Sequence, residues 1–317
     1  MITLKSLLKS FLNTKLISWC INQLKRIILP GFEGIPIWDV SVFFIKGITK
    51  GAINQRAAAS SFNFFLALFP TIIFFFTIIP YIPIAHFQDA LMSLIKEIMP
   101  ANTFEGIRST LEDIIKRQQG GLLSIGFLMA LYFSTNGINS LIESFNQTYH
   151  TIETRSAFKQ RMISIFLVLV LSVMIIIAIT LIVSSSFTLK YLVVKGILKK
   201  NFTIYIILFF KWLVVFALAL FGISLIYYYA PAKKEEFRFI TAGSMLATFL
   251  SIVTMLGFNI YITNFSKYNA LYGSIGTLLI IMLWIYFNAI ILLIGFDLNA
   301  SINNARKQKN SINVPKT

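Results

Sequence analysis

Charged side chains are scarce in this sequence: they make up 13% of its 317 residues, whereas hydrophobic side chains make up 57%. A soluble globular domain carries about 25% charged residues, so this balance excludes an ordinary water-soluble protein. Cysteine occurs once, at Cys20, which excludes an intrachain disulfide. Histidine occurs twice, and the sequence contains no paired-cysteine, zinc-protease or phosphate-loop motif. We therefore predict no metal and no cofactor.

Long apolar runs account for most of the chain. A helix rises about 1.5 Å per residue, so a run of about 20 apolar residues crosses a hydrocarbon core roughly 30 Å thick. Six runs meet this length: Ala57–Pro83, Leu122–Ile142, Met162–Phe187, Thr203–Ala230, Phe239–Thr263 and Leu271–Phe296. The sequence thus predicts an all-α polytopic membrane protein with six transmembrane helices.

The remaining segments are short, which divides the chain into one membrane domain and two tails. We predict an N-terminal amphipathic tail at 1–35, a six-helix membrane domain at 36–302 and a cytoplasmic C-terminal tail at 303–317. Apolar residues of the first tail fall on one helical face, which indicates a helix lying on the membrane surface, although a poorly ordered tail is the alternative. The connection after the first span, at 84–121, contains two further amphipathic patterns.

Positive charge is distributed unevenly between the two sets of connections. The formal net charge is +16, and the tails and even-numbered connections hold roughly twice as many Lys and Arg residues as the odd-numbered ones. The positive-inside rule then places both termini in the cytoplasm. The lysine-rich outer connection at 190–200 is an exception to this rule. Because these cations lie at membrane edges, we expect anionic lipid head groups, and no nucleic acid, as their partners.

Four stretches carry a family resemblance. They are AAASSFNFFLALFP in the first span, YFSTNGINSLIESFNQTYHTIETRS after the second, YYYAP closing the fourth, and NFSKYNALYGSIGTLLIIMLWIYFNAIILLIGFDLNA in the last. In order and spacing they resemble the YihY/virulence factor BrkB family, over roughly residues 36–302. The resemblance implies a six-helix protein of the bacterial inner membrane, from a family once labelled ribonuclease BN and generally treated as candidate transporters. It implies no substrate and no agreed site.

Ribonuclease activity, which the older label suggests, has little support in the residues. Such an enzyme needs carboxylates that hold a metal ion, or an acid and a base within reach of one phosphate. His86 follows the first span and His150 follows the second, so the predicted topology places them on opposite sides of the membrane. The acidic residues of the first outer connection alternate with bases along amphipathic helices, as on a solvated face. We expect a protein that is not an enzyme.

Polar side chains within the spans are the candidate functional residues, because each must find a partner or line a wet cavity. The inner halves of three spans contain the amides Asn63, Asn136, Asn139 and Asn288. The inner rim contains the charged residues Arg56, Glu143 and Asp297, and the outer half contains the polar residues Lys211 and Asn259. The inner groups could form a polar vestibule and substrate pathway. Alternatively, the amides only bond across packed helices, the rim charges are solvated, and Lys211 extends back to water.

Three residues predict helix geometry. Pro70 cannot donate a hydrogen bond to Leu66, so it should kink the first span, as a fixed bend or as part of a moving element. Gly273 and Gly276 give the sixth span a smooth outer end, where a neighbouring helix can approach closely. We interpret this end as a packing hinge first and a recognition site second.

The function that we predict is transport or export of an amphipathic or anionic lipid-like solute across the bacterial inner membrane. Amides and basic rims suit a polar head, and apolar walls tolerate a chain. The alternative is a non-transporting membrane organiser, whose Asn and Gly residues only hold helices together. The sequence leaves substrate identity, energy coupling and assembly into a homo-oligomer open.

Overall fold

The computed structural model describes residues 23–28, 31–32, 34–50, 52–81, 88–89, 92–93, 96, 105, 108–109, 112–113, 117–148, 153–194, 202–233, 238–264 and 266–313. In these ranges the chain forms helices and no strand. The helices are α3 (Ile37–Lys50), α4 (Ile53–Ile78), the short 3₁₀ helix η1 (Ile79–Tyr81), α7 (Gly120–Thr148), α8 (Ala157–Val194), α9 (Phe202–Tyr229), α10 (Ala242–Asn264) and α11 (Ser266–Asn313).

Six of these helices are long and apolar enough to cross a membrane, and each overlaps most of one of the six runs found in the sequence. The predicted all-α polytopic fold is therefore confirmed. Long side chains on these helices remain exposed, for example Phe75 at 62% and Leu128 at 63%, as expected of surfaces that face lipid. Residues 1–22 of the predicted N-terminal tail at 1–35, and most of the predicted connection at 84–121, lie outside the described residues.

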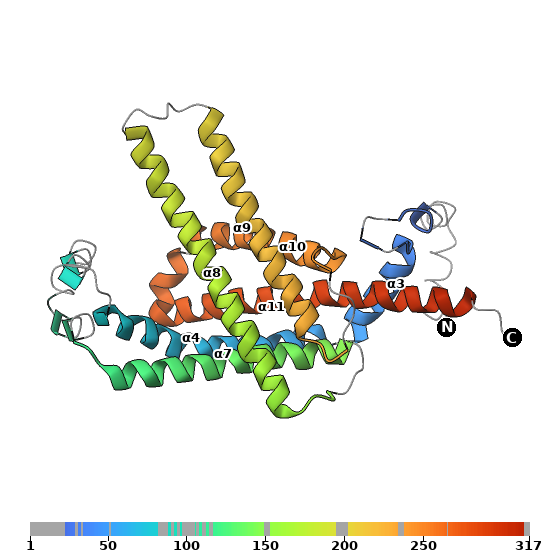
Figure 1. The fold of residues 1–317 in the computed structure, drawn as a ribbon, viewed down its shortest axis with the longest axis horizontal. Helices are drawn as coiled ribbons and strands as arrows, with labels where there is room; N and C mark the ends of the chain where they lie inside the picture. The colour runs from blue at the N-terminus through green and yellow to red at the C-terminus, as the bar shows by residue number, and fades with distance from the viewer. Residues whose placement is uncertain are drawn as a thin grey trace.

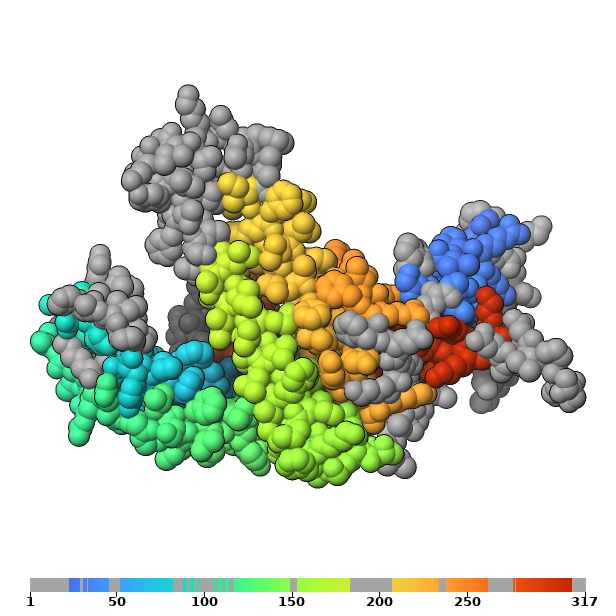
Figure 2. Space-filling view, in the orientation of Figure 1, coloured from blue at the N-terminus to red at the C-terminus, as the bar shows by residue number. Residues whose placement is uncertain are grey.

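Helices α4 and α7 form the most extensive pair and run antiparallel, because the first turns of α4 contact the last turns of α7. Helix α11 packs against α4 and α10, while α8 and α9 cross the others and extend beyond them (Figure 1). Figure 2 shows α7 and α8 side by side on one face of the molecule. Small residues allow the close packing of α4 on α7: Gly137 faces the Phe64 ring, and Gly126 faces the backbone of Phe74.

The core is concentrated where α4 begins and α7 ends, and we call this part of the bundle the Arg56 end. Phe145 of α7 stacks on Phe296 of α11, with ring centroids 4.1 Å apart. Tyr227 of α9 meets both rings edge-on and donates a hydrogen bond of 2.7 Å to the Leu292 carbonyl oxygen. Four helices therefore converge at the Arg56 end and fix the polar groups placed there.

Helix α11 continues to Asn313, into the range that the sequence assigns to a C-terminal tail. Its residues Leu298, Ile302 and Ala305, spaced by four and three positions, pack against α3 and the segment that precedes it. Lys309 Nζ also donates a hydrogen bond of 3.2 Å to the Gly34 carbonyl oxygen. Burial of this apolar stripe explains why the helix persists beyond the predicted end of its span.

Candidate functional site at the Arg56 end

The start of α4 places an arginine inside the bundle. Ala52 precedes the helix with a φ of +45°, in the left-handed region that non-glycine residues rarely occupy, and no side chain caps the helix there. One turn later, Arg56 lies on the face of α4 that also carries Ala57, Ser60 and Ser61, all buried. Because these neighbours are small, the long arginine side chain fits between α4 and α7.

Arg56 forms an ion pair with Asp297 of α11, and both side chains are almost fully buried. Arg56 Nη2 lies 3.1 Å from Asp297 Oδ2, and the two side chains are 4% and 2% exposed. Thr148 of α7 bridges the pair: it accepts a bond of 2.7 Å from Arg56 Nη1 and donates one of 2.6 Å to Asp297 Oδ1. Arg56 Nη1 also donates to the Ser144 carbonyl oxygen at 2.8 Å. One network thus joins α4, α7 and α11.

Hydroxyl groups extend this network along the α4–α7 interface. Ser140, Ser144 and Thr148 recur every four residues on one face of α7, and Ser140 Oγ lies 3.1 Å from Ser60 Oγ of α4. Ser144 Oγ in turn donates to the Ser140 carbonyl oxygen. At the Arg56 end the two apolar spans therefore meet through hydroxyls as well as through the apolar side chains of the core.

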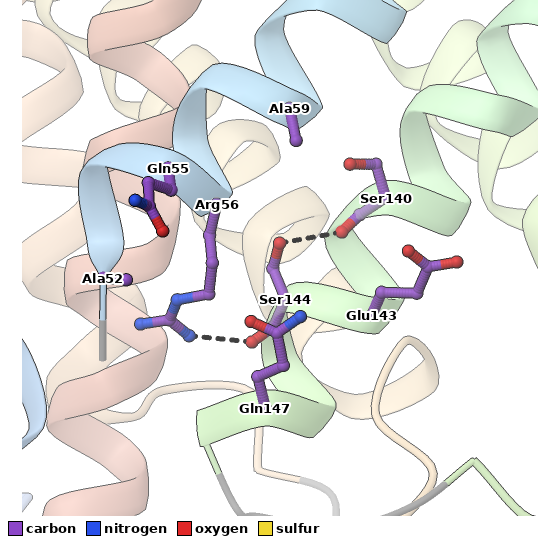
Figure 3. Close-up of a pocket in the computed structure, with 8 residues that line it drawn as sticks. All are labelled: Ala52, Gln55, Arg56, Ala59, Ser140, Glu143, Ser144 and Gln147. Atoms are coloured by element: carbon purple, nitrogen blue, oxygen red, sulfur yellow. Dashed lines mark hydrogen bonds between the residues drawn. The ribbon is translucent and has the colours of Figure 1, made fainter. Parts of the chain in front are cut away.

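A cavity opens between α4 and α7 beside this network. It holds about 210 Å³ and is lined by eight residues, namely Ala52, Gln55, Arg56, Ala59, Ser140, Glu143, Ser144 and Gln147. In Figure 3 the lining residues lie on neighbouring turns of α4 and α7, and the Arg56 guanidinium reaches towards Ser144. Arg56 Nε is buried and has no hydrogen-bond partner in the described structure. The volume corresponds to roughly seven water molecules, which suits a polar head group rather than a whole drug-sized molecule.

The energetics of the ion pair favour a built site over chance packing. Burying two charges costs several kcal/mol per ion, and only good geometry with further hydrogen bonds offsets this cost. Both Asp297 carboxylate oxygens and both Arg56 Nη atoms have partners, whereas Nε has none. The ion pair therefore fixes the position of the arginine that lines the cavity, and it leaves one buried donor unpaired.

A second polar cluster closes the same end of the bundle. Arg155 donates to both carboxylate oxygens of Glu153 at 2.7 Å, and its Nη2 donates to the Ala230 carbonyl oxygen at the end of α9. Asn146 donates to Glu153 and accepts a bond from the Ala232 N–H. The hydrogen bonds from Arg155, helped by its backbone N–H, by Asn146 and by the arginine charge, lower the pKa of Glu153 to about 2 against the opposing effect of burial.

This depressed pKa predicts a loss of stability in acid. An unfolded glutamate titrates near pH 4.3, so the cluster stabilises the fold above that pH and its contribution disappears as the pH falls towards 2. After allowance for partial exposure, we expect an effect on the order of 2 kcal/mol in the free energy of unfolding. Denaturant midpoints between pH 5 and pH 2 should fall more steeply for the native chain than for Glu153→Gln. A Glu112→Gln control should keep the native slope, and equal slopes for all three proteins would contradict the prediction.

Of the three predicted rim charges, the structure brings two together. Arg56 and Asp297 form the buried pair, although 241 residues separate them. Glu143 lines the same cavity, but its side chain is exposed and it makes no ion pair among the described residues. The predicted rim therefore divides into a buried salt bridge and a separate carboxylate at the cavity wall.

The four predicted amides make their bonds in two different places. Asn136 accepts a bond of 2.8 Å from Arg161 of α8, and Asn139 accepts one from Ser164 of α8. Asn63 and Asn288 instead donate to carbonyl oxygens four residues earlier in their own helices, those of Ala59 and Trp284. The bonds of Asn136 and Asn139 hold α7 against α8. A role of the four amides in a substrate pathway stays a prediction.

The other predicted residues lie away from the cavity. Lys211 is half-buried in α9, with its Nζ 5.4 Å from the centre of the Trp212 ring, and Asn259 is exposed on α10. Pro70 lies within α4, which continues through it. Gly276 is buried in α11, and Gly273 belongs to the same unbroken helix, although its surroundings lie outside the described residues. Their roles as pathway or hinge residues remain predictions.

Sequence reasoning missed the hydroxyls and the second cluster. Ser140, Ser144 and Thr148 carry a detectable signal, because polar residues at four-residue spacing in an apolar span indicate a polar stripe on one helix face. Glu153 and Arg155 carry a weaker sequence signal, because they are only an acid and a base two residues apart in a connection. Neither pattern indicates which helix the polar face meets.

Comparison with known proteins gives a consistent family. The family model described as Virulence factor BrkB matches residues 44–316, so the match extends past the end at residue 302 that the resemblance suggested. A protein of Bacillus subtilis (strain 168), YfkH, named only as ribonuclease-like, is 30% identical over 80% of this chain and 91% of its own. A UPF0761 membrane protein of Alteromonas mediterranea is 25% identical over 88% of this chain and 92% of its own length. Another, of Haemophilus influenzae, is 22% identical over 86% of this chain and 98% of its own length. No solved structure matches the chain.

Proposed function

The chain belongs to the virulence factor BrkB family of membrane proteins, and from that premise we propose that it moves an amphipathic or anionic lipid-like solute across the bacterial inner membrane. One observation carries the proposal. A polar cavity with a buried arginine opens at the Arg56 end, between two helices whose remaining outer surfaces are apolar and exposed. This combination suits a solute with a polar head and an apolar chain.

The shape of α4 supports a path for the chain of such a solute. From Ala59, which lines the cavity, the same helical face continues through Phe62, Leu66, Phe69 and Ile73, at spacings of three and four residues. Phe62 and Phe69 are 52% and 45% exposed, so the stripe is open to surrounding lipid. A head group in the cavity could therefore leave its chain on α4 without burying it in the protein.

The orientation that we propose places the Arg56 end and both termini in the cytoplasm. The excess of Lys and Arg on the tails and on the connections at this end supports it. To test it, Cys20 is replaced by serine and single cysteines are placed at Gly121 and Thr154, which are exposed at opposite ends of the helices. An impermeant maleimide should label the first in intact cells and the second only after permeabilisation; the reverse would invert the orientation.

Filling the cavity tests transport directly. In Ala59→Trp the indole should occupy the cavity, because Ala59 lines it. Purified protein in liposomes should accelerate the transbilayer movement of phospholipids with a fluorescent acyl chain, measured by bleaching of the outer leaflet, and Ala59→Trp should lose most of this acceleration.

Ala58→Trp is the matched control, since Ala58 is also exposed but does not line the cavity. It should retain the native rate. Two outcomes would contradict the proposal. In the first, the native protein moves the phospholipid no faster than empty liposomes do; in the second, Ala59→Trp moves it as fast as the native protein does.

The alternative function is that of a membrane organiser without transport. The bonds of Asn136 and Asn139 to α8 favour it, because they use intramembrane amides to hold helices together. Our proposal includes no reaction and therefore no enzyme. The name of the Bacillus relative concerns that protein. Among the described residues of this chain, no three His, Cys, Asp or Glu side chains are grouped so that they could hold a metal ion.

A further inference from the structure

The two walls of the cavity have opposite polarity. One wall is the first turn of α4, whose backbone N–H groups form the positive end of a helix dipole, and it includes Arg56. The other wall is the end of α7, whose terminal carbonyls form a negative end, and it includes Glu143. Because the helices are antiparallel, the two ends lie beside each other, as Figure 3 shows.

Formal charge within the cavity does not favour a simple anion. Of the two charged residues among the eight that line it, Arg56 is already neutralised by Asp297. Glu143 lies exposed at the cavity wall, without an ion pair among the described residues. A ligand with a net negative charge would meet that carboxylate without an unpaired cation to compensate for it.

Side-chain amides are the donors that remain for an acidic oxygen. Arg56 is 5% exposed, and its Nε has no partner in the described structure but is itself buried and not open to the cavity. The α4 terminus next to it lacks a side-chain cap, but the N–H groups of Gln55 and Arg56 already donate to the Ala52 carbonyl oxygen. Gln55 and Gln147 add amides that can donate or accept at the cavity mouth.

From these observations we propose that the cavity binds the zwitterionic head group of a phospholipid that carries a primary ammonium and a phosphate diester. The ammonium lies against Glu143 and the end of α7, and a phosphate oxygen accepts from the side-chain amides of Gln55 and Gln147. The acyl chains lie on the exposed stripe of α4 beyond Ala59. This inference rests on the proposed function, because it names the class of lipid that the same site would move.

A binding experiment separates this ligand from an anionic one. The detergent-purified full chain is titrated with phosphatidylethanolamine and with phosphatidylglycerol of identical acyl chains, and bound lipids are counted by native mass spectrometry. The native protein should prefer phosphatidylethanolamine. Glu143→Gln should lower this preference about tenfold, which corresponds to about 1.4 kcal/mol and lies near the low end for a charge-assisted hydrogen bond. Glu143→Lys should reverse the preference.

The controls address folding and the source of the head group. Glu143 is exposed, so the Glu143→Gln protein should keep the native unfolding midpoint, and Glu112→Gln should keep the native lipid preference. Free phosphoethanolamine should compete only weakly, because it lacks the chains that contact α4. Equal binding of the two lipids by native protein, an unchanged preference in Glu143→Gln, or competition by phosphoethanolamine at the concentration of the lipid would each overturn the inference.

The outcome is distinguishable from that of the transport test. A preference that depends on Glu143, without accelerated lipid movement in liposomes, would support the head-group assignment and contradict transport. Movement that is blocked by Ala59→Trp but does not differ between the two lipids would support transport and overturn the assignment.

Discussion

Replacing Arg56 by methionine is expected to destabilise the protein by about 3–5 kcal/mol, because it leaves the Asp297 carboxylate buried without its cation. Methionine retains most of the apolar stem of arginine, so lost packing contributes little. Thermal unfolding in detergent, followed by loss of the monodisperse peak in size-exclusion chromatography, would measure the change. We expect a markedly lower midpoint, or failure of the variant to accumulate in membranes.

The double variant Arg56→Met with Asp297→Leu identifies the cause. If the uncompensated charge is responsible, the double variant should recover much of the stability that either single variant loses, since an apolar pair can replace a buried ion pair at little cost. Arg117→Met is the surface control, because its ion pair with Asp113 is exposed and 4.0 Å long. Additive losses in the double variant would show that the two residues act independently.

Substituting alanine for Gly243 is expected to separate α10 from α11. A β-carbon at this position would overlap the backbone carbonyl oxygen of Gly295 and lie 2.7 Å from the Asn299 side chain. The Asn299 amide also accepts a bond from the Gly243 N–H at 2.8 Å and donates to Thr241. Because backbone atoms block the new methyl group, the helices must move apart. We expect a loss of about 2–3 kcal/mol in unfolding free energy.

Gly257 in the same helix provides the matched control. A β-carbon there meets nothing within 4 Å, so Gly257→Ala should gain stability from its helix propensity, by up to about 1 kcal/mol. Both variants add one methyl group to α10, and only the one at the crossing should lower the unfolding midpoint. Equal midpoints would show that α10 and α11 do not need their close approach.

The six spans were predictable because each is an apolar run as long as the membrane is thick, which is a property of local sequence. The extension of α11 was not, since Asn303, Arg306 and Lys307 suggest a solvated tail. What keeps those turns helical is a stripe of Leu298, Ile302 and Ala305 that packs on a segment far earlier in the chain. Only the fold brings that partner into contact.

The site was partly predictable for a similar reason. Arg56 and Asp297 could be placed at one rim, because depth follows from position along a span. Their pairing depends on rotation about the helix axes, which a single sequence constrains poorly when spans are apolar on all sides. Rotation also decides that Asn136 and Asn139 meet α8, whereas the Ser140 hydroxyl meets Ser60 of α4. The Ser144 carbonyl oxygen likewise accepts a bond from Arg56 of α4.

The continuity of α11 has a mechanical consequence. One uninterrupted rod carries Asp297 inside the bundle and, one turn further, the apolar patch that holds α3. A tilt that lengthened the contact between Asp297 and Arg56 would swing α3 through the same angle. If a solute in the cavity loosens the contact between Asp297 and Arg56, we expect α3 to move with α11, and a fluorophore on α3 should report this movement without touching the solute.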